Sequence, residues 1–71
     1  EFSVYPNPTN NELNISVENN STIKLLDLTG KLINTSNSSM TTWDVSNLEN
    51  GIYILSIENN GVITTQKIVK Q

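Results

Sequence analysis

The chain has no cysteine, no histidine and no arginine among its 71 residues. Without cysteine, neither a disulfide nor a thiolate-bound metal can cross-link the fold. The fold therefore has to be stabilised by side-chain packing in the core alone. Without cysteine and histidine, the chain lacks the side chains most often used in nucleophilic and acid–base catalysis. We therefore expect no enzyme, no catalytic residue, no metal site and no cofactor.

Positive charge is also scarce, since four lysines stand against seven acidic residues and the net charge is −3. Nucleic-acid-binding proteins usually show the opposite balance, so nucleic acid is not an expected partner. The carboxylates occur singly, without the spacing of a calcium loop or the pairing of an acid–base site. No apolar run approaches the roughly 18 residues of a membrane-spanning helix, so we expect no membrane insertion.

No segment repeats its apolar residues at the 3.6-residue period of a helix. Short runs of Ile, Val, Leu and Thr alternate with polar residues instead, and Gly or Asn turn signals separate them about every ten residues. The expected strands are 2–5, 12–17, 21–28, 31–36, 41–45, 51–58 and 62–69. The pattern predicts one all-β domain over 1–71, a compact immunoglobulin-like antiparallel β-sandwich of about seven short strands, and a five- or six-stranded barrel is the structural alternative.

Turn residues predict how several strands connect. Thr29-Gly30 joins two strands into a hairpin over 22–36, and Asn60-Gly61 joins 51–58 to 62–69. Asp27 is expected to accept hydrogen bonds from backbone amides of the first of these turns.

The first strand should end after Tyr5, because Pro6 and Pro8 remove two backbone donors within three residues. Pro8 also biases Asn7 away from helix, so this segment should fix the direction of the chain as it leaves the strand.

Leu48, Gly51 and Tyr53 have the L-x-x-G-x-Y spacing of a tyrosine corner. The Tyr53 hydroxyl should then bond to backbone just upstream, and Gly51 should allow a tight turn beneath the ring. The alternatives are a ligand role for Tyr53 and a sugar-stacking role for Trp43, which otherwise belongs to the core. The expected core consists of Leu13, Ile15, Ile23, Leu25, Trp43, Val45, Leu48, Tyr53, Leu55 and Ile57.

The last strand is the candidate partner-binding site, and its residues are Lys67, Ile68, Val69 and Lys70. Neither face of this strand is purely apolar. One interpretation is an edge strand whose lysines prevent edge-to-edge aggregation. The other is an edge that a partner binds by strand addition, with the two lysines meeting acidic groups.

Four sequence blocks occur in a fixed order along the chain: Tyr5-Pro6-Asn7-Pro8, Asp27-x-x-Gly30-Lys31, Asp44-Val45-Ser46-x-Leu48-x-x-Gly51-Ile52-Tyr53 and Lys67-Ile68-Val69-Lys70. Together they cover essentially the whole chain. With these blocks in this order, the chain resembles the type A C-terminal sorting domain of proteins that Bacteroidota secrete by the type IX system.

The resemblance implies a compact β-sandwich, excised here from a larger secreted protein whose cargo precedes it. The cargo would cross the periplasm, and the domain would direct it through the outer-membrane type IX translocon to the cell surface or the medium. A sortase-like peptidase would remove the domain upstream of its first strand. The abrupt end at KIVKQ would then be the end of the full protein. We expect a monomer whose partners are translocon components and this peptidase. The alternatives are a carbohydrate-binding module and an immunoglobulin-like spacer.

Overall fold

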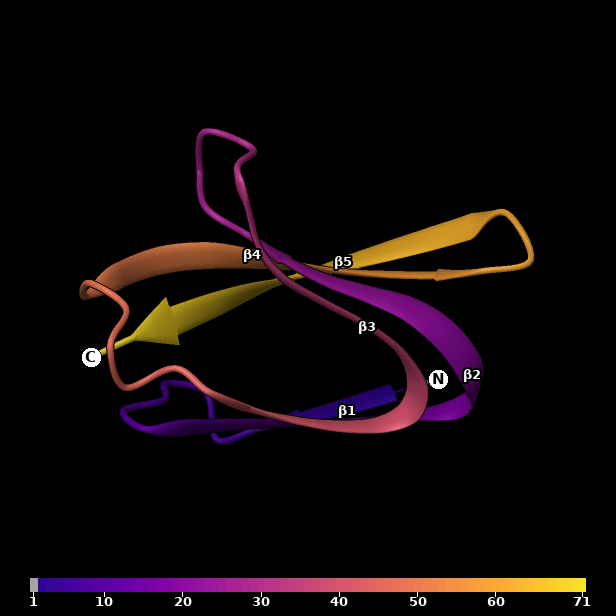
Figure 1. Cartoon of the computed structure of the whole chain (residues 1–71), viewed down its shortest axis with the longest axis horizontal. Coiled ribbons are helices and arrows are strands. Elements are labelled where there is room, and N and C mark those ends of the chain that lie inside the picture. The colour runs from indigo at the N-terminus through magenta and orange to yellow at the C-terminus, as the bar shows by residue number, and fades with distance from the viewer. Residues whose placement is uncertain (1) are drawn as a thin grey trace.

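The computed structural model describes residues 2–71, and every regular element in them is a strand. All the strands belong to one antiparallel sheet (Figure 1). The prediction of an all-β antiparallel domain is therefore confirmed. The strands are β1 (Phe2–Tyr5), β2 (Glu12–Leu26), β3 (Leu32–Asp44), β4 (Gly51–Asn59) and β5 (Val62–Lys70).

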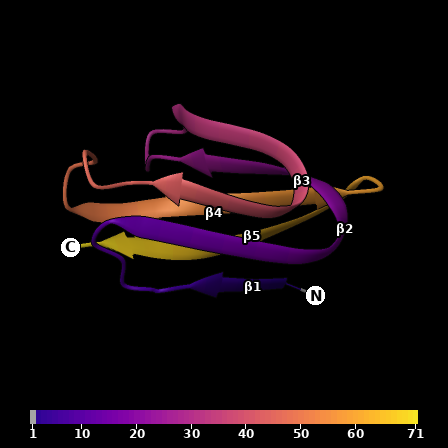
Figure 2. The same cartoon turned by 60° about the horizontal axis from the view of Figure 1, so that its bottom comes forward.

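The long strand β2 organises the sheet, whose order is β1-β2-β4-β5 with β3 also paired to β2. The first part of β2 pairs with β1 and with the end of β3, whereas its last part pairs with β4 and with the start of β3. A register shift between Ser16 and Ser21 separates the two parts. Such irregularities bend a strand and increase its twist, and here the sheet curls at this point (Figure 2).

Residues 2–71 form five strands instead of about seven. The expected strands 12–17 and 21–28 are continuous within β2, and 31–36 and 41–45 are continuous within β3. The mostly polar stretches between them, 18–20 and 37–40, remain extended because β2 and β3 stay paired on both sides of the bend. All five strands share one sheet, so a separate two-sheet sandwich is not confirmed, and the end strands β1 and β5 do not pair into a closed barrel within residues 2–71.

The core lies inside the curl of the sheet. Leu13 and Ile15 from the first part of β2 pack in one cluster with Ile23 and Leu25 from its last part. All the expected core residues are buried except Leu48, which is half-buried and packs against the cluster. Ile68 of β5 also belongs to the core. This was not predicted, because neither face of its strand is purely apolar in sequence.

The predicted turns are present. Asn60 and Gly61 have φ angles of 53° and 78°, the left-handed conformation at both positions that a two-residue type I′ hairpin turn requires. They join β4 to β5 as expected. The first strand ends at Tyr5, directly before Pro6. The peptide bonds before both prolines are cis.

Replacing Leu55 by alanine should remove most of the stability of the domain. Leu55 is completely buried in the centre of the cluster. The truncation should lower the free energy of unfolding by about 2–5 kcal/mol, whereas so small a domain has only about 5 kcal/mol in total. Urea unfolding measures this loss. Leu28→Ala, at an exposed position, should stay within about 0.5 kcal/mol of the parent. Equal midpoints for the two variants would contradict the placement of Leu55.

Candidate partner-binding site on the C-terminal strand

Strand β5 carries the candidate site and lies at one end of the sheet. Its inner edge pairs with β4 along the whole strand, from Val62 opposite Asn59 to Lys70 opposite Gly51. Backbone groups alternate in direction along an antiparallel strand, so every second residue of β5 points its N–H and C=O away from β4. Those outward groups form the outer edge of the sheet, where a partner strand could add.

The side chain of Asn7 covers part of this outer edge. Its Nδ2 donates a hydrogen bond of 3.0 Å to the carbonyl oxygen of Lys67, and its Oδ1 accepts one of 3.0 Å from the N–H of Val69. The carboxamide thus presents one donor and one acceptor to β5, as a neighbouring strand would. Asn7 can do this because it lies between Pro6 and Pro8, directly after β1 ends.

Thr9 continues the same contact by its backbone. Its N–H donates to the carbonyl oxygen of Val69, and its carbonyl oxygen accepts from the N–H of Gln71, both at 2.9 Å. This is a short parallel bridge between Thr9 and Lys70. Thr9 is almost fully buried, and its hydroxyl donates to the carbonyl oxygen of Glu12. We call the pairing of Asn7 and Thr9 with residues 67–71 the terminal clamp.

The terminal clamp corrects one prediction. The backbone edge of Lys67–Lys70 was expected to lie free for a partner, but the clamp pairs it with the chain's own beginning. No local sequence pattern predicts this contact, because Asn7 and Val69 are 62 residues apart. Asn7 was identified only as part of the Pro-Asn-Pro block, and Thr9 was not identified at all.

The side chains of the four predicted binding residues also differ in exposure, which the sequence analysis did not predict. Lys67 is exposed, but Lys70 is only 6% exposed and Ile68 only 2%. Lys70 faces inward because it lies two residues after Ile68, on the same face of the strand. Its Nζ donates to the oxygen of Gln71 at 3.2 Å. Both interpretations of this strand require its lysines at the surface, and Lys70 does not lie there.

The Asp27 turn forms as predicted. One carboxylate oxygen of Asp27 accepts hydrogen bonds from the N–H and the hydroxyl of Thr29 and from the N–H of Lys31. Gly30 has a φ of 91°, a left-handed conformation that favours glycine. The Thr29 hydroxyl bond, followed by the Lys31 backbone bond, holds the pKa of Asp27 below its usual value, because both stabilise the charged form.

A second turn repeats this arrangement at Asp44. Its Oδ1 accepts hydrogen bonds from the hydroxyl and the N–H of Ser46, and these bonds lower the pKa of Asp44. Asp27 is half-buried and Asp44 is exposed, and both carboxylates accept hydrogen bonds within their own turns, which is a structural use. They form no acid–base pair, and no cluster of three or more metal-ligating side chains exists within the described part of the chain.

The tyrosine corner is present. The Tyr53 hydroxyl donates a hydrogen bond of 2.7 Å to the carbonyl oxygen of Glu49. Gly51 has a φ of 150°, which lies outside the range that other residues readily adopt. Tyr53 and Trp43 are both buried in the core, so neither offers the exposed ring that a sugar-stacking site needs.

Comparison with known families decides what kind of domain carries this clamp. A family model described as the secretion system C-terminal sorting domain matches residues 3–71. The chain belongs to this family. The match includes the clamp residues and β5, and it confirms the resemblance to type IX sorting domains. A comparison with curated proteins found no match.

Membership of the family gives the domain a role as a C-terminal signal for type IX secretion. Sorting domains of this kind are attached to an N-terminal cargo, which they direct toward the outer membrane or the extracellular space. The family is not an enzyme family. Within residues 2–71, no helix has the length and apolar character needed to cross a bilayer.

Asn7→Ala should weaken the terminal clamp without touching the core. Two hydrogen bonds are lost, so the free energy of unfolding should fall by about 1–3 kcal/mol. The amide hydrogen of Val69 should also exchange faster, because it loses its acceptor. Denaturant unfolding and amide exchange measure the two effects, and Asn47→Ala, at an exposed turn position, is the matched control. A Val69 amide that stays protected in Asn7→Ala would contradict the clamp.

Tyr53→Phe should destabilise the domain by about 0.5–1.5 kcal/mol, since it removes only the hydrogen bond to Glu49. The exposed Tyr5 supplies the matched control, because Tyr5→Phe removes a hydroxyl that faces solvent. Thermal melts of both variants test the difference. If they melt together, the corner hydrogen bond contributes nothing to stability.

Proposed function

We propose that this sorting domain directs an attached cargo protein from the periplasm through the outer-membrane type IX translocon. A sortase-like peptidase then removes the domain at a site upstream of β1. The observation that carries the proposal is the family match over residues 3–71, which spans the clamp and the C-terminal strand together. The mature cargo is anchored at the cell surface or released.

The arrangement of the termini supports this role. The first residues of β1 and the last residues of β5 lie at opposite ends of the domain (Figure 2). Cargo that continues from the start of β1 therefore leaves the clamp and the end of β5 accessible to a receptor. The four clamp hydrogen bonds form only when the domain is folded, so the translocon would recognise a folded surface.

Among the four residues expected to bind the translocon, Lys67 is the candidate for direct contact. It is exposed, and an exposed cation can meet an acidic group on a receptor without a large desolvation cost. Ile68 and Lys70 are both buried, so they would hold the end of β5 in place and leave the direct contact to Lys67. Val69 is half-buried, and its backbone is held by Asn7 and Thr9.

The position of β1 supports cleavage upstream of it. All four residues of β1 pair with β2, so they are held in the sheet. A peptidase needs an accessible extended chain, and the linker that precedes a folded domain usually provides one. The peptidase would therefore cut before Phe2 and leave the domain intact.

A reporter fusion tests the function. A periplasmic reporter followed by residues 1–71 should reach the surface or the medium in a type IX-competent host, and it should stay in the periplasm when residues 66–71 are deleted. Lys67→Ala should slow export while the melting temperature stays unchanged. Lys24→Ala, at an exposed position on β2, is the matched control and should be exported normally.

The outcomes separate the possibilities. A parent fusion that stays in the periplasm would contradict the sorting function and favour an immunoglobulin-like spacer. Normal export of folded Lys67→Ala would contradict a contact between the Lys67 side chain and the translocon. The deletion by itself cannot assign Lys67, because it also removes Ile68 from the core.

A further inference from the structure

The outer edge of β5 has two parts that differ in their partners. From Lys67 onward, the terminal clamp covers it. Over residues 62–66, no strand or side chain of the described chain pairs with it. We call this second part the open edge.

The open edge presents backbone groups ready for hydrogen bonding. The carbonyl oxygen of Lys67 and the N–H of Val69 both point outward, toward Asn7. The pairing of β5 with β4 continues to Val62 without a register shift. Because backbone direction alternates, Ile63 and Thr65 point their N–H and C=O groups outward as well. These groups have no hydrogen-bond partner within residues 2–71.

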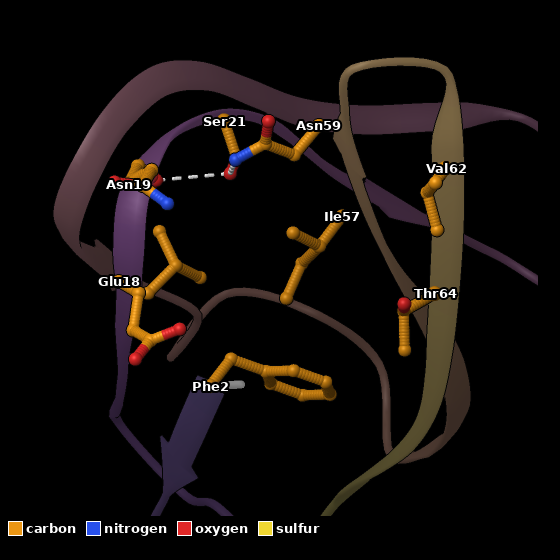
Figure 3. A pocket seen from close by; sticks show the side chains of 9 residues that line it. Phe2, Glu18, Asn19, Ser21, Ile57, Asn59, Val62 and Thr64 are labelled. Carbon is orange, nitrogen blue, oxygen red and sulfur yellow. Dashed lines mark hydrogen bonds between the residues drawn. The ribbon is translucent and has the colours of Figure 1, made fainter.

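Side chains on the inward face of the open edge are not covered. Val62 shares its face with Ile68, yet Val62 is 66% exposed whereas Ile68 is 2% exposed. A hollow of about 180 Å³ lies beside Val62 and Thr64, across from Phe2 on β1 (Figure 3). Val17 and Ile57 add apolar surface to this hollow, which is large enough for one apolar side chain. Its polar lining comes from Glu18, Asn19, Ser21 and Asn59.

The open edge also lacks the usual protection against strand addition. Soluble proteins commonly place lysine, proline or a bulge on an exposed edge. Here the sequence from Val62 to Thr65 carries no charge and no proline, and Ile63 is 61% exposed. Lys67 and Lys70 lie only where the clamp already covers the edge. The lysines therefore do not protect the part of β5 that is open.

We propose that the open edge receives an extended strand of the export machinery, which pairs with Ile63 and Thr65 and places an apolar side chain in the hollow. This rests on the proposed secretion function and moves strand addition from Lys67–Lys70 to residues 62–66. The length of the edge favours this occupant. A stable dimer of two copies usually buries about 800 Å² on each partner, far more than five edge residues supply. A short extended peptide needs only such an edge and a pocket for alternate side chains.

Thr65→Pro tests the proposal. Proline removes the outward N–H of Thr65, and an edge strand tolerates it where that N–H has no partner in the fold. In the reporter fusion, Thr65→Pro should lower the export rate at least about tenfold while the domain still melts cooperatively. Thr65→Ala keeps the N–H and should be exported at the parent rate. Normal export of folded Thr65→Pro would overturn the proposal.

A second variant covers the case in which Thr65→Pro does not fold. Val62→Asp combined with Ile63→Asp changes two exposed side chains and leaves the buried core intact. It should also slow export, because a charge beside the hollow opposes an apolar side chain entering it. Export of this folded variant at the parent rate would overturn the proposal. If the parent fusion itself is not exported, the sorting function fails, and this proposal fails with it.

Amide exchange on the purified fusion distinguishes the other possible occupants. The amides of Ile63 and Thr65 should exchange rapidly before the machinery is met, because no group within residues 2–71 pairs with them. Protection that does not change with dilution would assign the open edge to the cargo linker. Protection that is lost on dilution would assign it to a second copy of the chain. Either result would overturn the proposal.

Discussion

The pairing of Asn7 and Thr9 with the end of β5 is the contact on which the rest of the domain depends. Without it, β5 would be held by β4 alone, and β1 would be held by β2 alone. The clamp ties the segment that follows β1 to the end of β5 and so holds the two end strands of an open sheet together. A 71-residue chain without cysteine has no disulfide to fix its ends. The clamp also keeps Ile68 and Lys70 against the core.

The same contact divides the C-terminal strand into a structural part and a free part. Residues 67–71 serve the fold, because their outward backbone groups are paired and two of their side chains are buried. Residues 62–66 present unpaired backbone, exposed apolar side chains and a hollow. A sorting signal has to be stable enough to fold and still offer a surface to a receptor. We propose that the clamped backbone of residues 67–71 meets the first need, and that the exposed Lys67 side chain and the open edge meet the second.

Much of the fold follows from local sequence. Alternating apolar residues predicted the all-β class and nearly the whole core, because period-two burial is a local property of a strand. The turns at Asp27–Lys31 and Asn60-Gly61 and the tyrosine corner were also predictable, since each closes its hydrogen bonds within a few residues. The four ordered sequence blocks identified the family, which the family match then confirmed. The strand count was wrong, because mostly polar stretches can bend a paired strand without ending it.

The sequence by itself determined the all-β class, the turns, most of the core and the membership of a secretion family. Only the tertiary structure decided which edge of the C-terminal strand is free. The free edge depends on hydrogen bonds from Asn7 and Thr9 to residues about 60 positions away. It also depends on the curl of the sheet, which buries Lys70 but leaves Val62 exposed. Local patterns report whether a residue alternates with its neighbours. They do not report which distant segment pairs with its backbone, because that depends on how the whole sheet curls.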